Sequence, residues 1–236
     1  QLFPRTISPK FCLLSLLRVY SMTNQIKHFC VPNYSLYGNK NIILPEGRLG
    51  YFELVSNKEN PYILIHPALT GSPKLVTTGK PSQGEGWWND AIGKGKLIDT
   101  DLYNIICVDP VGGNGDSTSA LELGELVTEV TFHDTIEITR LLLESKGITK
   151  IFAVIGGSIG GGQSFLWLEH AKRIEVRHIV DISGYCGSDK LATDFFAMQV
   201  DLLRGEGKNV RNLTERFIQN FEKLCLQSEG FRIVYY

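Results

Sequence analysis

Residues 150–173 read KIFAVIGGSIGGGQSFLWLEHAKR, and this stretch decides the fold. The apolar run KIFAVIGG (150–157) predicts a strand that is buried on both faces. The segment GGGQSFLWLEHAKR (160–173) predicts a helix directly after it. Five glycines surround Ser158 at the junction of the two elements. These glycines either cradle a phosphate or allow a sharp turn that displays the serine.

The pattern Gly156-x-Ser158-x-Gly160 is typical of a nucleophile elbow, a strained turn between a strand and a helix. Small neighbours keep this turn free of clashes, and the free N–H groups at the helix start can stabilise an oxyanion. A phosphate loop would need a Gly-Lys-Ser/Thr sequence, and no lysine follows here. The elbow is the leading prediction, with a purely structural glycine turn and a phosphate loop as its alternatives.

Working outward, further apolar runs alternate with helical patterns. Strands are predicted at 62–69, 103–112 and 176–184, an edge-type strand at 48–57, and a helix at 130–148. This alternation predicts an α/β fold with a mostly parallel sheet and helices on both faces. Residues 187–228 are helical and amphipathic, and no buried strand follows them.

A second segment agrees with the elbow. The strand sequence YILIHP (62–67) runs into the loop ALTGS (68–72), within the motif HPALTGS. In a fold with this kind of elbow, that loop supplies one oxyanion N–H, and the residue after the nucleophile supplies the other. Leu69 and Ile159 are therefore the candidate oxyanion donors. Taken alone, HPALTGS is better explained as an ordinary exit from a strand, and only its combination with the elbow favours the oxyanion role.

Composition excludes several classes of function. The chain has 236 residues, which is enough for one sizeable core. Its formal charge is -1, so it has no overall positive charge that would attract nucleic acid. No apolar stretch approaches the roughly 20 residues that span a bilayer. The five cysteines are widely spaced without a CxxC pair, which argues against a disulfide framework or a zinc site and favours a reducing, cytoplasmic setting.

The sequence suggests three segments. Residues 1–25 are predicted to be a leader or upstream sequence, because no acidic residue occurs there and Met22 is a plausible start. Residues 26–186 form the predicted α/β core. Residues 187–236 form a helical cap segment that we expect to be truncated, since the chain stops on the apolar run GFRIVYY.

Several blocks together resemble the homoserine O-acetyltransferase family, whose members have the α/β-hydrolase fold. These blocks are HPALTGS, GWWNDAIGKGKLIDTDLYNIICVDPVGGNGDSTS, VTFHDTIEITRLLLESKGI and VIGGSIGGGQSFLWLE, within residues 48–184. The resemblance implies that Ser158 is the nucleophile, with Leu69 and Ile159 at the oxyanion positions. It implies transfer of an acetyl group from acetyl-CoA, as a co-substrate, to a small alcohol such as homoserine. Neither a cofactor nor a metal is required, and a homodimer through the cap helices is compatible with the sequence.

The chain departs from the family pattern in two respects. The family's triad aspartate and histidine follow the cap, so we expect them to be missing from these 236 residues. We assign none of His66, His133, His170 and His178 as a substitute base, because their expected positions do not suit that role. The family also has an arginine in the first cap helix, where the segment FFAMQVDLLRG (195–205) offers Asp201.

From these departures we expect the chain as given to be an inactive or nearly inactive fragment of an acyltransferase. Two other functions stay open. One is hydrolysis by a serine esterase or thioesterase that uses the same elbow. The other is a truncated, non-catalytic homologue that acts as a binding or dimerising module.

Overall fold

The computed structural model describes residues 25–69, 71–77, 86–113, 115–170 and 173–184. The chain divides into two compact units at the boundary between Tyr185 and Cys186, and all described residues belong to the first unit. The predicted cap at 187–236 and nearly all of the predicted leader therefore lie outside the described residues.

The regular elements follow the predicted alternation of strands and helices. The strands are β1 (Lys27–Ser35), β2 (Ile43–Leu54), β3 (Tyr62–His66), β4 (Asn104–Val108), β5 (Lys150–Gly157) and β6 (Glu175–Ile182). The helices are α1 (Ala120–Leu123), α2 (Phe132–Ser145) and α3 (Ile159–His170), and a 3-10 helix, Gly124–Glu129, follows α1. Both long helices lie within a residue or two of where the sequence pattern predicts them to begin.

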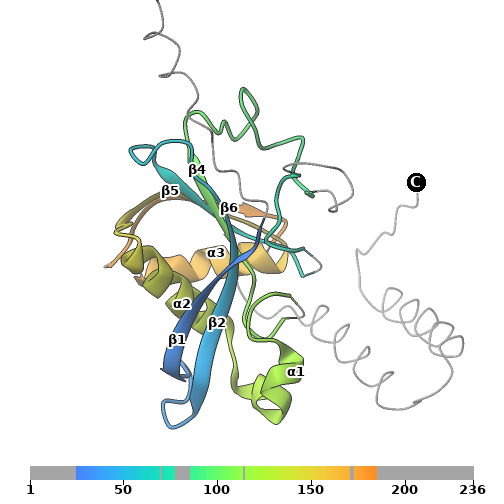
Figure 1. Ribbon diagram of the computed structural model, residues 1–236, viewed down its shortest axis with the longest axis vertical. Coiled ribbons are helices and arrows are strands. Elements are labelled where there is room, and N and C mark those ends of the chain that lie inside the picture. The colour runs from blue at the N-terminus through green and yellow to red at the C-terminus, as the bar shows by residue number, and fades with distance from the viewer. Residues whose placement is uncertain (1–24, 70, 78–85, 114, 171–172, 185–236) are drawn as a thin grey trace, which may run out of the picture. The chain divides into compact units, whose positions relative to one another are not determined.

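The described strands form one sheet in the order β1-β2-β4-β3-β5-β6 (Figure 1). β4, β3, β5 and β6 run parallel to one another, whereas β1 and β2 are antiparallel to their neighbours. This confirms the predicted α/β fold with a mostly parallel sheet. Because the carboxyl ends of parallel strands meet at one edge of a sheet, the turns that follow β3, β5 and β6 lie together. His66 and Gly156 are direct partners at that edge.

β2 differs from the prediction. We expected an edge-type strand over 48–57, but β2 begins at Ile43 and pairs with β1 on one side and β4 on the other. The edge position was therefore wrong, and β1 is the strand that the sequence did not reveal. Its sequence, KHFCVPNYS, mixes polar and apolar residues and contains Pro32, which an edge strand tolerates because one side of its backbone needs no partner.

Burial separates the inner strands from β6. All five residues of β4 are buried, as expected for a strand covered on both faces. β6 was also predicted to be buried, but Val180 and Ile182 are 41% and 46% exposed. In the described part of the chain β6 is an outer strand that pairs only with β5, so solvent reaches side chains that an inner strand would cover.

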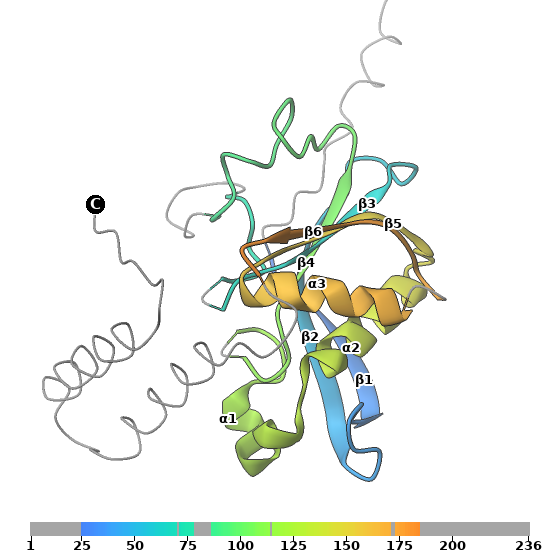
Figure 2. The same cartoon turned by 180° about the vertical axis from the view of Figure 1, so that it is seen from behind.

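Apolar side chains form a core on each face of the sheet. The first core joins α2 and α3 to one face (Figure 2), through Ile138, Leu142 and Trp167 packed near Leu64 and Ile106. The second core covers the other face with loop residues, namely Leu75, Val76, Ile92 and Ile98. Helices were predicted on both faces. In the described residues both long helices lie on the first face, and irregular segments cover the second.

Polar contacts at the start of α2 attach this helix to the sheet. Thr131 and Asp134 form a capping box, which satisfies free N–H groups of the first turn. The same Asp134 carboxylate accepts hydrogen bonds from the Tyr34 hydroxyl at 3.1 Å and the Tyr37 N–H at 2.7 Å. The helix ends before Gly147, which adopts the left-handed φ of 71° that commonly follows a helix. None of the described helices combines the length and apolar character needed to cross a membrane.

Candidate active site

Ser158 stands between the last residue of β5 and the first residue of α3. Its φ of 53° lies in the left-handed region, which costs energy for a residue with a side chain. The Ser158 N–H donates to the Ile182 carbonyl at 2.8 Å, and the Ser158 carbonyl accepts from the Gly161 N–H at 2.9 Å. These bonds on both sides hold the strained turn, and the Ser158 residue is exposed.

The two glycines of the motif have no room for a side chain. A Cβ at Gly156 would overlap the backbone of Gly160 and would also meet the hydroxyl of Ser164. A Cβ at Gly160 would overlap the carbonyl oxygens of His66 and Pro67. The glycines therefore allow β5, α3 and the loop after β3 to approach one another closely, as the elbow interpretation requires.

The first turn of α3 also packs against the end of β6. The Asp181 carboxylate accepts the Gly184 N–H at 2.8 Å, and it lies so close to Gly161 that a Cβ there would overlap it. A Cβ on Gly184 would lie 2.7 Å from the Ser158 carbonyl oxygen. The N–H of Ile159, the first residue of the helix, has no acceptor within the helix. The helix start can therefore offer a donor and a positive dipole end beside Ser158.

The loop after β3 carries the second candidate donor, Leu69. The Gly71 N–H donates to the Ala68 carbonyl at 2.8 Å and closes a tight turn that includes Leu69. The Leu69 side chain is 68% exposed, so its packing does not account for its position. Because His66 and Pro67 touch Gly160, the structure brings this loop to the start of α3, where Ser158 and Ile159 lie.

Polar groups are buried directly behind the elbow. His66 is fully buried, and its Nε2 accepts a hydrogen bond from Trp167 Nε1 at 2.9 Å. Burial lowers the pKa of His66 to about 3, so the imidazole is neutral at physiological pH. In the described part of the chain His66 Nδ1 has no hydrogen-bond partner, and neither has the side-chain amide of the fully buried Gln163.

The sequence pattern did not single out Gln163 or Trp167. Both lie on the buried face of α3, one turn apart. The available indication was that polar groups lie on the apolar face of the predicted helix, because buried polar groups usually need a hydrogen-bond partner. The partner of Trp167 is His66, which is 101 residues away and could not be inferred from local spacing.

None of the four other histidines has a side chain that the structure places beside Ser158. His28 lies on β1, at the opposite side of the sheet from β5. His133 stacks on Tyr37 with ring centroids 4.6 Å apart. His178 pairs with Ala153 and packs its ring edge-on to Phe152, so it lies beside β5 residues five and six positions before Ser158.

His170 is the last residue of α3, and its side chain lies outside what the structure describes. Its backbone is twelve residues beyond Ser158, which corresponds to about 18 Å along a helix. His66, in turn, has its Nε2 occupied by Trp167. Among the histidines whose side chains the structure describes, none contacts Ser158 in a way that would make it a general base.

The buried carboxylate at the carboxyl end of β4 is committed to its own loop. Asp109 accepts the Ser117 N–H at 3.0 Å, and the Ser117 hydroxyl donates to the Asp109 carbonyl at 2.6 Å. Burial raises the pKa of Asp109, and hydrogen bonds to its carboxylate from Ser117 and Asp116 partly offset that rise. Asp109 therefore shapes the turn after β4. In the described residues no group of three or more His, Cys, Asp and Glu side chains could hold a metal ion.

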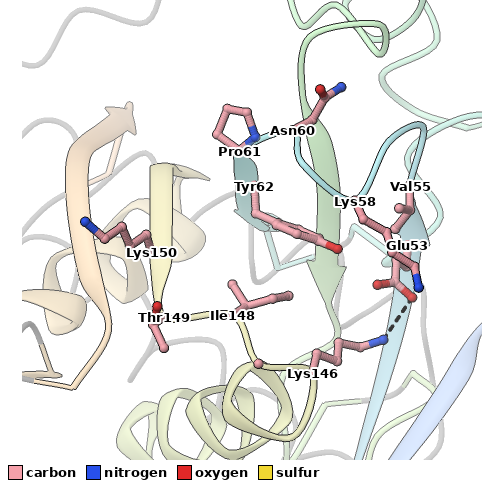
Figure 3. A pocket seen from close by; sticks show the side chains of 11 residues that line it. Glu53, Val55, Lys58, Asn60, Pro61, Tyr62, Lys146, Ile148, Thr149 and Lys150 are labelled. Carbon is pink, nitrogen blue, oxygen red and sulfur yellow. Dashed lines mark hydrogen bonds and ion pairs between the residues drawn. The ribbon is translucent and has the colours of Figure 1, made fainter.

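A pocket of about 570 Å³ lies at the other end of the sheet (Figure 3). Its lining includes Tyr62 and Lys150, which are the first residues of β3 and β5, and Lys146, which follows α2. Lys146 makes an ion pair of 3.0 Å with Glu53 across this pocket. Ser158 follows the opposite end of β5, so the pocket is not part of the candidate site. The cap segment with Asp201 lies outside the described residues.

Comparison with known sequences agrees with the fold. A family model described as α/β hydrolase fold matches residues 61–231. The homoserine O-acetyltransferase of Methanobrevibacter ruminantium is 36% identical over 125 residues, which cover 50% of this chain and 25% of that protein. The homoserine O-acetyltransferase of Desulfotalea psychrophila is 38% identical over 128 residues, which cover 50% of this chain and 33% of that protein. The chain thus spans about a quarter to a third of the length of these homologues.

Solved structures show the same fold. The homoserine O-acetyltransferase from Staphylococcus aureus superimposes with a TM-score of 0.67 at 19% identity, over 89% of this chain and 68% of that one. Esterase E22 superimposes with a TM-score of 0.68 at 24% identity, over 78% of this chain and 54% of that one. A transferase and an esterase therefore share this arrangement of strands and helices.

Proposed function

This chain belongs to the α/β-hydrolase family, and on that premise we propose that the whole protein is an O-acyltransferase that forms an acyl-enzyme on Ser158. The observation that supports this proposal most strongly is the geometry of Ser158, an exposed serine held at φ 53° between two glycines that cannot carry a Cβ. Homology to homoserine O-acetyltransferases over half the chain favours acetyl-CoA as donor and homoserine, or a similar small alcohol, as acceptor. The cytoplasmic location and the homodimer expected from the sequence belong to the same proposal.

In the proposed reaction the Ser158 hydroxyl attacks the carbonyl carbon of the thioester and loses its proton to a base. The N–H groups of Leu69 and Ile159 stabilise the negative oxygen of the tetrahedral intermediate. The thiolate leaves with a proton, and the acyl group remains on Ser158 as an ester. The hydroxyl of the acceptor then attacks this ester, which releases the O-acyl product and restores the serine.

The base in this scheme would come from residues other than the described histidines. Serine is a weak nucleophile without an adjacent base, and loss of one triad member lowers the rate by several orders of magnitude. We therefore propose that residues 1–236 alone transfer acyl groups very slowly. A measurable rate for this chain that disappears in Ser158→Ala would contradict that part of the proposal.

The serine can be tested in the whole protein with mass spectrometry and kinetics. Ser158→Ala should remove the acetylated peptide and lower the rate by at least ~10³-fold. Ser183→Ala is a matched control, because Ser183 is also an exposed serine with a positive φ, 56°, at the end of the neighbouring strand β6. Loss of acylation in the control, with retention in Ser158→Ala, would refute the assignment.

Hydrolysis is the second candidate function, because solvent reaches Ser158 in the described part of the chain. An esterase or thioesterase would pass the acyl group to water from the same intermediate. Turnover of p-nitrophenyl acetate measured with and without homoserine separates the two. Acceleration by homoserine with formation of O-acetylhomoserine supports transfer, whereas an unchanged rate supports hydrolysis. Absence of any acyl-enzyme in the whole protein would favour the third function, a non-catalytic binding module.

A further inference from the structure

His66 connects the two parts of the candidate site. It is the last residue of β3, so the loop with Leu69 begins directly after it. Its side chain is fully buried and reaches Trp167 of α3, with a distance of 2.9 Å between Trp167 Nε1 and His66 Nε2. An indole N–H can only donate, so His66 Nε2 must accept, and the proton of the neutral imidazole sits on Nδ1.

The backbone of the same residue touches the same helix. The carbonyl oxygens of His66 and Pro67 lie against Gly160, the second residue of α3. The loop is therefore fixed to α3 at two levels, by the backbone at Gly160 and by the side chain at Trp167. Trp167 is itself fully buried in the core that joins α2 and α3 to the sheet. A hydrogen bond to so fixed a donor leaves His66 little freedom to move.

We propose that the hydrogen bond between His66 and Trp167, here called the His66–Trp167 clamp, positions the Leu69 N–H relative to the Ile159 N–H. The inference rests on the proposed function, because it assigns these two residues to the oxyanion hole. His66 and Trp167 are positioning residues, since neither touches the reacting atoms. Their effect on catalysis would come through geometry, and a displacement of about 1 Å can reduce a rate by ~10²-fold.

Two variants remove the clamp and one preserves it. His66→Leu removes the acceptor, and Trp167→Phe removes the donor while keeping an aromatic ring. Trp167→Phe serves as the removing variant if His66→Leu does not fold. His66→Gln keeps an acceptor for Trp167 Nε1 and preserves the clamp. We expect the first two to lower kcat of the whole protein by ~10- to 100-fold with KM for the acyl donor unchanged. His66→Gln should keep most of the activity, and the double variant should lose no more than either single one.

Tyr34→Phe is the matched control. It removes a buried side-chain hydrogen bond of 3.1 Å to Asp134, also from an aromatic residue, and Tyr34 lies on β1, at the opposite edge of the sheet from β6. If the clamp has only a structural role, its removal in His66→Leu or Trp167→Phe should act like Tyr34→Phe. All three variants would then have lower stability and normal kcat in the folded protein. We expect Tyr34→Phe to lower stability and to leave kcat unchanged.

Amide hydrogen exchange tests the clamp without any activity. The Gly71 N–H is protected by its bond to the Ala68 carbonyl, so its exchange reports on the loop. We expect at least ~10-fold faster exchange at Gly71 in His66→Leu and Trp167→Phe than in Tyr34→Phe or the parent. Unchanged exchange would overturn the clamp, whatever the activity.

The remaining outcomes separate the clamp from the proposed function. Faster exchange with unchanged kcat, in a protein whose activity depends on Ser158, would show that the clamp holds the loop but does not govern catalysis, and this overturns the inference. If the whole protein shows no activity that depends on Ser158, the proposed function fails and the catalytic part of the inference fails with it. The exchange data then still decide whether His66 and Trp167 fix the loop.

Discussion

Gly157 and Gly160 stand on either side of Ser158 and meet different surroundings. A Cβ at Gly160 would overlap two carbonyl oxygens of the backbone, which cannot move without displacing β3 or its loop. We predict that Gly160→Ala lowers the free energy of unfolding by about 1–3 kcal/mol, the usual effect of overpacking, or by somewhat more. Urea unfolding followed by tryptophan fluorescence measures the difference.

Gly157→Ala provides the comparison for that measurement. The nearest atom to a Cβ at Gly157 is the Ile182 carbonyl oxygen, 4.0 Å away. This is an ordinary contact, and alanine is preferred to glycine inside a strand by roughly 0.5–1 kcal/mol. The control should therefore be neutral or slightly more stable than the parent. Equal losses for the two variants would show that the close approach at Gly160 does not limit the fold.

At the scale of residues, the sequence predicted what depends on local chemistry. Glycines at both sides of Ser158 indicated the strained turn, because few other residues permit such a close approach. The contact of His66 with Trp167 joins residues 101 positions apart. Histidine and tryptophan each occur in many structural settings, so neither residue indicates its partner. Pairing of that kind depends on strand order, which a single sequence does not specify.

Among the short elements, α1 depends on polar caps more than on packing. Leu123 is the buried residue of this four-residue helix. Ser119 and Glu122 form a capping box, and Arg48 of β2 donates to both Glu122 carboxylate oxygens, at 2.9 and 2.8 Å. Hydrogen bonds from the backbone N–H of the N-cap residue Ser119, from Arg48 and from the Ser119 hydroxyl together lower the pKa of Glu122 to about 2. The segment is therefore attached to the sheet through a carboxylate.

We predict that Ser119→Ala lowers the free energy of unfolding by about 1 kcal/mol, because the N-cap hydroxyl no longer accepts the Glu122 N–H. Exchange of the amides in 120–123 should also become faster. Ser145→Ala is a suitable comparison, since the Ser145 hydroxyl donates to the Leu142 carbonyl at the end of α2 and caps no free N–H. A larger loss in Ser145→Ala than in Ser119→Ala would contradict the role of the cap.

Strand prediction succeeded where the sequence has a continuous apolar run. β4 and β5 have continuous apolar sequences, and the structure confirms both. β1 was missed because its residues are mostly half-exposed or exposed, so its pattern does not differ clearly from that of a loop. The edge position of β2 was then wrong for the same reason, since its partner was unknown. The order of the strands follows from long-range pairing and could not be read from composition.

At the scale of the whole described unit, two cores of different construction hold the sheet. Regular helices cover one face, and their periodic apolar residues made that core predictable. Irregular segments cover the other face, where Gly86 packs against the Val76 backbone and Trp87 Nε1 donates to the Ser72 carbonyl at 2.8 Å. Such contacts have no period, so the sequence did not reveal which residues would cover this face. The candidate site lies where the carboxyl ends of the strands between these cores converge.

His66 couples this unit to pH, because its ring is buried between the sheet and α3. Burial lowers the pKa of His66 from 6.5 to about 3 in the folded protein. Above pH ~6.5 the imidazole is neutral in both states, and its contribution to stability is fully present. As the pH falls from ~6.5 towards 3, the unfolded chain binds a proton that the folded protein does not bind. The free energy of unfolding should then decrease by up to about 1.4 kcal/mol per pH unit.

Urea unfolding of the parent and of His66→Gln, at a series of pH values from about 7.5 down to 4, tests this dependence. Carboxylates such as Glu122 titrate in both proteins, so the difference between the two profiles isolates His66. We expect that difference to be constant above pH ~6.5 and to shift in favour of His66→Gln at lower pH. Parallel profiles over the whole range would mean that His66 accepts a proton in the folded protein as readily as in the unfolded chain. That outcome would contradict the structure, because the His66 ring is buried from solvent and its Nε2 already accepts a hydrogen bond from Trp167.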